Sequence, residues 1–240
     1  MDAVLYEKPK RIELIGYQLF VDGKSHPRSV RTLEQMKGTV MKYHDEAANL
    51  EMYYMFRAVH KSEDVRFDIT VIPPLEVGGE CAKTHGHYHP AGDDGMPYPE
   101  VYQVLRGSGV FVLQKKNRNA GTVDVMVVHA SEGDAVLLPP GFGHVSVNTG
   151  DVPLVLSNLV YDKFESIYDD YTENQGAAIY YLKDGELVHN TNYIIKRSEN
   201  LKADILNRRY GFSSKDLLSE FYADPHKFAF LARPKILFKS

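Results

Sequence analysis

Short strand-like runs separated by turn residues fill the middle of the sequence, from about residue 52 to about residue 190. Valine, isoleucine, tyrosine and phenylalanine dominate runs such as YYMFRAV, RFDITVI, GVFVLQ and VDVMVVHA, and Gly, Pro, Asn and Asp interrupt them at close intervals. This pattern is typical of an all-β sandwich or barrel. We therefore expect an all-β fold whose core occupies about residues 50–190.

Segments with helical periodicity flank this region. TLEQMKG has Thr32 and Gln35 at capping-box spacing, and SENLKADILNRRYG and SSKDLLSEFYADP near the C-terminus show similar signals. Each segment carries one apolar stripe and is too short to be stable alone, so we expect these pieces to pack on the barrel. Because no repeat or low-complexity linker divides the chain, the sequence predicts a single domain over residues 1–240, with an N-terminal extension (1–49) and a C-terminal helical extension (191–240).

Charge and cysteine content exclude several classes of function. A formal net charge of −4 gives no overall positive field for nucleic acid or an anionic membrane surface. The chain has neither a leader-like start nor a run of about 18 uncharged apolar residues, which predicts a cytoplasmic, unanchored protein. Cys81 is the single cysteine, so any metal ligands must come from histidines and carboxylates.

The heptapeptide THGHYHP places His85, His87 and His89 at alternate positions. In an extended backbone, residues two apart share one face, so these imidazoles can all point the same way. Such an array is poor core packing, because buried neutral imidazoles need hydrogen-bond partners and protonated ones repel one another. A metal ion resolves both problems, although an isolated H-x-H is equally compatible with a solvated loop.

Two longer patterns extend this signal. The first is H-Y-H-x10-E-x6-G, running from His87 to Gly107, and the second is G-x5-P-x-G-x2-H-x3-N, running from Gly133 to Asn148. Together they resemble the two sequence motifs of the cupin superfamily, which are antiparallel jelly-roll β-barrels. In such barrels the first motif supplies two histidines and a glutamate and the second supplies a third histidine. The resemblance implies a metal site made of His87, His89, Glu100 and His144.

This ligand set is chemically reasonable for a catalytic metal. Three imidazoles and one carboxylate leave one or two coordination positions open for water or substrate. Such a site accepts iron, nickel, manganese, zinc or cobalt, and we favour iron, with one divalent ion per subunit. One ambiguity of register remains, because His85 has the right spacing to replace His89.

Several further segments narrow the resemblance. RTLEQMKG, FDITVIPP, EVYQVLRGSGVFVLQ and LLPPGFGHVSVNTGDVPLVLSNLVY resemble the archaeal cupin-type glucose-6-phosphate isomerases over roughly residues 28–190. This resemblance favours His87 and His89 over the alternative register. It implies a homodimer that interconverts glucose 6-phosphate and fructose 6-phosphate in glycolysis and gluconeogenesis. About 50 C-terminal residues have no counterpart in that family.

The resemblance also implies roles for individual residues. Glu100 is the candidate catalytic base as well as a ligand, and these roles conflict because a coordinated carboxylate is a weaker base. A hydride shift would need no base. Hydroxyls and backbone amides are expected to contact the substrate, including its phosphate, at Thr70, Thr84, Gly86, Tyr102, Tyr161 and Tyr171. Either Tyr53 or Tyr54 is a further candidate.

Other functions fit the same motifs. A cupin dioxygenase can use an identical ligand set, and another sugar-phosphate isomerase or epimerase, or a non-catalytic sugar-binding cupin, is also compatible. Thr84 and Gly86, next to the ligands, favour the isomerase. The six remaining histidines lack partners at ligand spacing and are interpreted as surface or structural residues.

Overall fold

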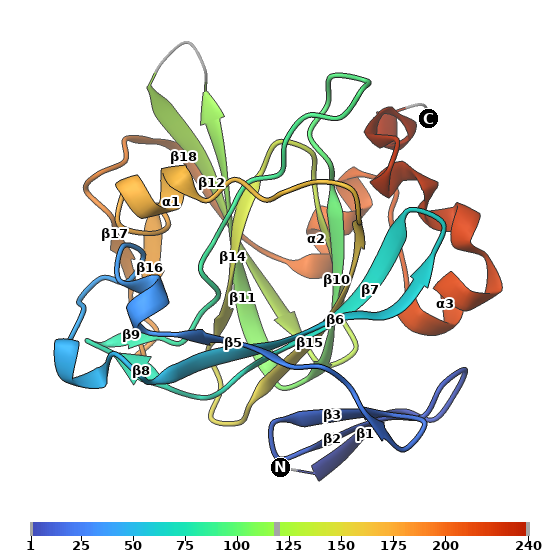
Figure 1. Ribbon diagram of the computed structural model, residues 1–240. Coiled ribbons are helices and arrows are strands. Elements are labelled where there is room, and N and C mark those ends of the chain that lie inside the picture. The colour runs from blue at the N-terminus through green and yellow to red at the C-terminus, as the bar shows by residue number, and fades with distance from the viewer. Residues whose placement is uncertain (1, 118–120, 239–240) are drawn as a thin grey trace.

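The computed structural model describes residues 2–117 and 121–238. Its largest element is a six-stranded antiparallel sheet that runs across the molecule (Figure 1). In spatial order its strands are β13 (Ala135–Leu138), β10 (Glu100–Arg106), β15 (Leu154–Tyr161), β7 (Val65–Ile72), β6 (Glu51–Ser62) and β5 (Ser29–Thr32).

A second sheet faces the first. It has four strands, in the order β14 (Gly143–Asn148), β11 (Ser108–Asn117), β12 (Thr122–Ser131) and β18 (Ile195–Lys202). Apolar side chains from both sheets, including Val104 from β10 and Phe111 from β11, form one interior cluster between them. The all-β prediction is confirmed, and in the described part of the chain the two sheets are separately hydrogen-bonded layers of a jelly-roll barrel.

The six-stranded sheet is covered on both faces. In β7, Phe67 and Ile69 point outward into one apolar cluster, while Asp68 and Thr70 alternate with them and point inward. Double coverage explains why an antiparallel strand reads as a nearly continuous apolar run. The outer cover combines an N-terminal sheet and C-terminal helices (Figure 1), namely β1 (Asp2–Tyr6), β2 (Ile12–Ile15), β3 (Gln18–Val21), β4 (Lys24–Ser25), α3 (Leu217–Ala223), η3 (Pro225–Leu231) and η4 (Pro234–Phe238).

Smaller elements cover the outer face of the four-stranded sheet. Valines of β11, β12 and β14 pack there against Tyr171, Ile179 and Tyr193. The elements on this side are β8 (Glu76–Val77), β9 (Glu80–Cys81), α1 (Asp169–Glu173), β16 (Ile179–Tyr181) and β17 (Leu187–His189).

The predicted flanking helices are only partly correct. The described part of the N-terminal 49 residues contains short strands, β1 to β5, and no α-helix. The helix expected at TLEQMKG is the short 3-10 turn η1 (Glu34–Met36), followed by η2 (Asp45–Ala47). The amides of Leu33 and Glu34 donate to the carbonyls of Leu50 and Ala48, respectively. Hydrogen bonds to a distant segment therefore satisfy the amide groups that would stay unpaired in the first turn of a helix.

Near the C-terminus, SENLKADILNRRYG is half strand and half helix. Its first five residues belong to β18, which pairs in parallel with β12, and α2 (Ala203–Arg209) begins only after them. Tertiary pairing therefore overrides the local helical pattern. No helix among the described residues is long and apolar enough to cross a membrane.

Two buried amide side chains attach the C-terminal extension to the sheet. Asn207 of α2 accepts from the Leu137 amide at 2.9 Å and donates to the Ala135 carbonyl at 2.7 Å, which caps the edge strand β13. Gln103 of β10 donates to the Lys215 carbonyl at 2.6 Å and accepts from the amide that opens α3 at 3.0 Å. We infer from these contacts and the shared apolar cluster that the chain folds as one domain.

The cap on β13 gives a stability prediction. Asn207→Ala leaves a buried amide and a buried carbonyl without partners, so we expect the free energy of unfolding to fall by about 2–3 kcal/mol. Urea unfolding followed by circular dichroism measures the change. Asn200→Ala, at an exposed position of β18, is the control and should stay within about 0.5 kcal/mol. Equal stability of the two variants would show that the C-terminal extension is not anchored through Asn207.

Candidate metal centre

Main-chain pairing with β14 positions the histidine segment. Residues 82–87 run antiparallel to β14, and the Thr84 amide donates to the Ser146 carbonyl at 2.9 Å. Further along, the His87 and His144 backbones exchange hydrogen bonds of 3.3 and 3.0 Å. Two motifs that are far apart in sequence therefore bring their histidines directly opposite each other.

Gly86 turns the segment so that its histidines separate. It has a φ of +87°, and a Cβ at this position would lie 2.5 Å from the Tyr171 ring and 2.8 Å from Val145. Before this bend the imidazole of His85 packs edge-on against Tyr168, with ring centroids 5.1 Å apart. The expected single face for all three histidines therefore does not include His85.

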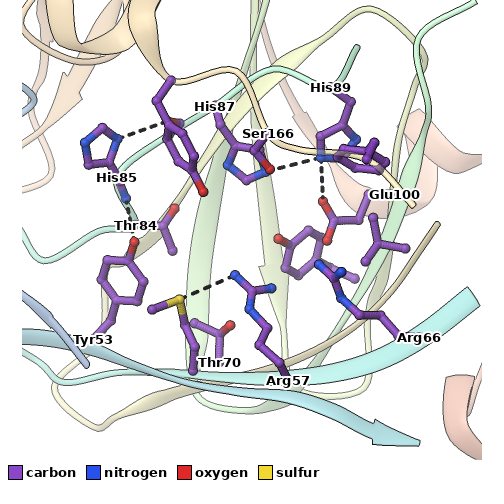
Figure 2. A pocket seen from close by; sticks show the side chains of 16 residues that line it. Tyr53, Arg57, Arg66, Thr70, Thr84, His85, His87, His89, Glu100 and Ser166 are labelled. Carbon is purple, nitrogen blue, oxygen red and sulfur yellow. Dashed lines mark hydrogen bonds and ion pairs between the residues drawn. The ribbon is translucent and has the colours of Figure 1, made fainter. Parts of the chain in front are cut away.

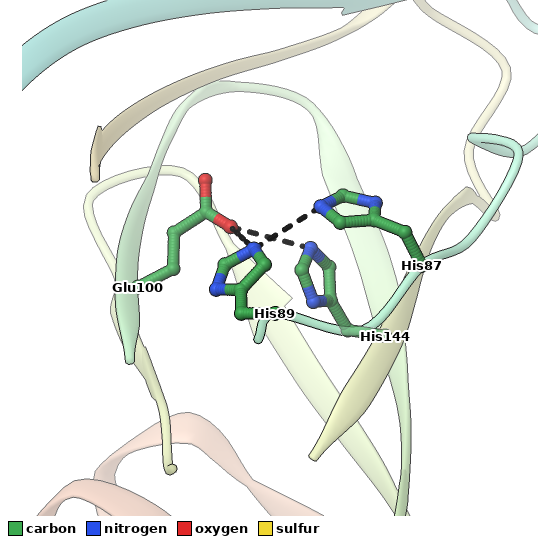
Figure 3. Close-up of side chains that lie close together, drawn as sticks. All are labelled: His87, His89, Glu100 and His144. Atoms are coloured by element: carbon green, nitrogen blue, oxygen red, sulfur yellow. Dashed lines mark hydrogen bonds and ion pairs between the residues drawn. The ribbon is translucent and has the colours of Figure 1, made fainter. Parts of the chain in front are cut away.

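The four side chains of the predicted ligand set converge on one point (Figure 3). The ligand atoms of His87, His89, Glu100 and His144 all lie within 4.8 Å of one another. Glu100 Oε2 is 3.4 Å from His89 Nε2 and 3.3 Å from His144 Nε2. The Nε2 atoms of His87 and His89 are 3.2 Å apart.

Neighbouring groups orient these side chains. The Tyr98 carbonyl lies 2.9 Å from His89 Nδ1 and can only accept, so the proton sits on Nδ1 and the Nε2 lone pair faces the cluster. Asn158 of β15 donates to Glu100 Oε1 at 2.7 Å. Tyr102 Oη lies 3.4 Å from His144 Nε2. His89 and Glu100 thus have outer hydrogen bonds of the kind that orient metal ligands, whereas Tyr102 approaches the nitrogen of His144 that faces the cluster.

Burial sets the protonation states of the cluster. It lowers the pKa of His89 to about 4, although the bond to the Tyr98 carbonyl opposes this shift. Burial, with smaller effects of neighbouring imidazoles, also holds the pKa values of His87 and His144 well below their usual range. Desolvation raises the pKa of Glu100 to about 8, with Arg57 opposing the shift. The imidazoles are therefore neutral, and the carboxylate has lost its hydration.

A divalent metal fits this arrangement. In the described part of the chain no hydrogen bond reaches the buried Glu100 Oε2. Ligands at about 2.0–2.2 Å from one ion are roughly 3.0–3.5 Å apart in tetrahedral or octahedral geometry. The spacings of 3.2, 3.3 and 3.4 Å fall in that range.

A pocket opens beside the cluster (Figure 2). Thr70, Thr84, Gly86 and Tyr102, four of the six predicted substrate-binding residues, line it. Of the two further tyrosine candidates, Tyr53 lines the pocket. The Tyr54 side chain packs instead in the apolar cluster on the outer face of the six-stranded sheet.

The other two predicted substrate-binding tyrosines lie outside the pocket lining. Tyr171 is fully buried behind Gly86, in the apolar cluster outside the four-stranded sheet. Tyr161 packs at a tilt against Tyr98, with ring centroids 4.5 Å apart, and lines a separate cavity next to the C-terminal helices. Their roles as direct substrate contacts stay predictions.

The pocket also contains residues that the sequence analysis missed. Arg57 and Arg66 line it, together with Ser166 and Tyr168 from the segment after β15. The two arginines make ion pairs with Asp68, which is 0% exposed. The alternation of Arg66, Asp68 and Thr70 along β7 was a usable signal, because residues two apart share the inner face.

Comparison with known proteins agrees with this geometry. A family model described as glucose-6-phosphate isomerase (GPI) matches residues 30–196. The isomerase of Thermococcus litoralis is 30% identical over 171 residues, covering 67% of this chain and 84% of its own. That of Pyrococcus furiosus is 30% identical over 193 residues, covering 76% and 95%. The chain belongs to the cupin-type glucose-6-phosphate isomerase family.

The match to this isomerase family includes every residue of the metal cluster but excludes β1–β4 and the elements from α2 onward. A bacterial isomerase, from Sinorhizobium medicae, is 30% identical over 131 residues, covering 55% of this chain and 57% of its own. Among solved structures, the oxalate decarboxylase of Bacillus subtilis overlaps 48% of this chain and 26% of its own, at 19% identity and a TM-score of 0.35.

The cluster predicts a specific effect of removing one imidazole. In His144→Ala only three ligands remain, so we expect metal affinity to fall at least roughly tenfold and the purified protein to lose most of its metal. Elemental analysis after dialysis measures this content. His129→Ala, on β12 outside the cluster, is the control and should retain its metal. Full metal content in His144→Ala would remove this residue from the ligand set.

Proposed function

We propose that the protein interconverts glucose 6-phosphate and fructose 6-phosphate at this cluster, with one divalent metal per subunit held by His87, His89, Glu100 and His144. The observation that carries the proposal is the convergence of these side chains at the base of a polar pocket, in a chain of the isomerase family. We favour iron as the metal, and propose a cytoplasmic homodimer, as the sequence resemblance implies.

Aldose–ketose isomerisation moves a proton between C1 and C2 through an enediol, while charge develops on O1 and O2. When bound, the metal supplies a Lewis acid for those oxygens. The chain must supply the rest, which is a group to hold the proton, contacts that fix the sugar, and walls that exclude water. Phe164 contributes one wall, because its ring lies 4.5 Å from the His89 ring.

Glu100 is the proposed proton carrier. Asn158 occupies Oε1, so Oε2 is the oxygen free to take a proton or to bind the metal. Burial raises the pKa of the carboxyl to about 8 in the absence of a metal, and a bound cation would lower it and favour the ionised form that a base needs. Because three imidazoles would remain to hold the metal, we expect loss of the Glu100 carboxylate to reduce turnover more strongly than metal content.

The phosphate end of the sugar is assigned to the opposite side of the pocket. Thr70, Thr84 and Gly86 lie there, and Tyr53 Oη accepts from the His85 amide at 3.3 Å. Hydroxyls and amides on rigid strands can bind phosphate oxygens because they are oriented in advance. We propose that Tyr171 acts indirectly, through its packing against Gly86.

The activity itself has a direct test. In a coupled assay we expect conversion of fructose 6-phosphate to glucose 6-phosphate, its loss after chelation, and its return when a single divalent ion is added back. Oxygen consumption under the same conditions distinguishes a dioxygenase and should stay at background. Full activity in metal-free protein, confirmed by elemental analysis, would contradict the proposal.

The role of Glu100 has a separate test. Fructose 6-phosphate turned over in D₂O should give glucose 6-phosphate that carries deuterium at C2, because the base exchanges its proton with solvent. Glu100→Gln keeps an acceptor for Asn158 and should reduce turnover by at least about 100-fold, with a much smaller loss of metal. No deuterium at C2 would support a hydride shift, and parallel loss of metal and turnover would make Glu100 a ligand only.

A further inference from the structure

Arg57 lies at an irregular turn in β6 and lines the pocket on the same side of the strand as Tyr53 and Met55. The pairing of β6 with β7 shifts register between Phe56 and His60, and Ala58 within this bulge has a φ of +52°. The Ala58 amide donates to Asp68 Oδ1 at 2.7 Å, so the carboxylate that receives Arg57 also holds the bulge. A strained non-glycine residue at such a point is a frequent mark of a functional site.

The charges around Arg57 are not balanced. Asp68 Oδ2 accepts from Arg57 Nη1 and from Arg66 Nε, both at 2.8 Å, so two guanidinium groups share one carboxylate. Arg66 has a second carboxylate, Asp162, at 3.0 Å. In the described part of the chain Asp68 is the only carboxylate within ion-pair distance of Arg57. The pocket therefore contains positive charge that an anion can neutralise.

Arg57 also has hydrogen-bonding capacity to spare. Its Nη2 contacts the Met55 sulfur, a weak acceptor, at 3.4 Å. Met55 pairs with Thr70 across β6 and β7, which places this nitrogen close to a proposed phosphate contact. Figure 2 shows the guanidinium directed into the pocket beside Thr70. The side chain is 46% exposed although Asp68 is fully buried, so its free face is open to a ligand.

We propose that Arg57 binds the phosphate of the substrate and makes the pocket selective for phosphorylated over neutral sugars. This inference rests on the proposed function and deepens it, because neutral donors alone were expected at the phosphate end. A guanidinium fixed by Asp68 on one edge can present its other edge to two phosphate oxygens. Asp68 is then a positioning residue, while Arg57 contacts the ligand.

A dead-end ligand separates binding from turnover. Sorbitol 6-phosphate has the phosphate and hydroxyls of the substrate but no carbonyl, so calorimetry with the metal-loaded protein measures its dissociation constant alone. In Arg57→Gln we expect this constant to rise roughly 10- to 100-fold, as for loss of a charge-assisted hydrogen bond. KM for fructose 6-phosphate should rise in parallel, with kcat within about threefold. Arg57→Lys should recover part of the affinity.

The control is Lys61→Gln, which removes a nearby positive charge outside the pocket. Lys61 forms an ion pair with Asp162 and is 47% exposed. The affinity of this variant for sorbitol 6-phosphate should stay within about twofold of that of the unmodified protein, because Lys61 lies outside the pocket lining and can act only by long-range attraction, which salt screens. An equal loss in both variants would mean long-range attraction and would overturn the proposal.

Two other outcomes are informative. If Arg57 instead stabilises ionised Glu100, Arg57→Gln will lower kcat and shift its pH profile while sorbitol 6-phosphate binds as before, which would overturn the proposal. Elemental analysis of each variant shows whether the metal is retained. If Arg57→Gln does not fold, the affinity of Arg57→Lys for sorbitol 6-phosphate is compared with that of the unmodified protein instead. Absence of isomerase turnover in the unmodified protein would count against the proposed function, whereas the calorimetric comparison would still test Arg57.

Discussion

Three neutral imidazoles and one carboxyl group share a single buried point, where burial disfavours an isolated negative charge unless a proton or a cation neutralises it. Much of the surrounding structure serves to hold this cluster. Main-chain pairing places His87 opposite His144, the Tyr98 carbonyl fixes the proton of His89, and Asn158 holds one oxygen of Glu100. Binding of a divalent metal by these side chains would therefore stabilise the fold as well as complete the site.

The inner face of the six-stranded sheet can carry polar side chains because apolar packing on its outer face stabilises the strands. The N-terminal sheet and the C-terminal helices bury the outer face of that sheet, and the resulting apolar cluster stabilises the strands. The inner face can then carry Arg66, Asp68 and Thr70 on one strand and Glu100 and Tyr102 on another. The elements outside the family match thus support the strands that form the pocket.

The sequence predicted the metal cluster well because its residues lie in two compact motifs with fixed spacing. It did not predict that the His85 imidazole lies in the pocket wall outside the cluster, on the other side of the bend that Gly86 makes against Tyr171 and Val145. The strand at residues 198–202 was also missed, because its pairing with β12 is a long-range contact that local periodicity does not encode. Arg57 was missed although it follows Tyr53 and Met55 at two-residue spacing on the face of β6 that lines the pocket, because its ion pair with Asp68 on β7 is a contact that local periodicity does not encode.

The central claim is that these four side chains bind one metal ion. X-ray absorption spectroscopy of the metal-loaded protein, at the edge of whichever divalent ion restores activity, tests it most directly. The account predicts one ion per chain with nitrogen and oxygen neighbours at about 2.0–2.2 Å and the outer-shell scattering of three imidazoles. A bound ion surrounded by oxygen alone, without imidazole scattering, would contradict it.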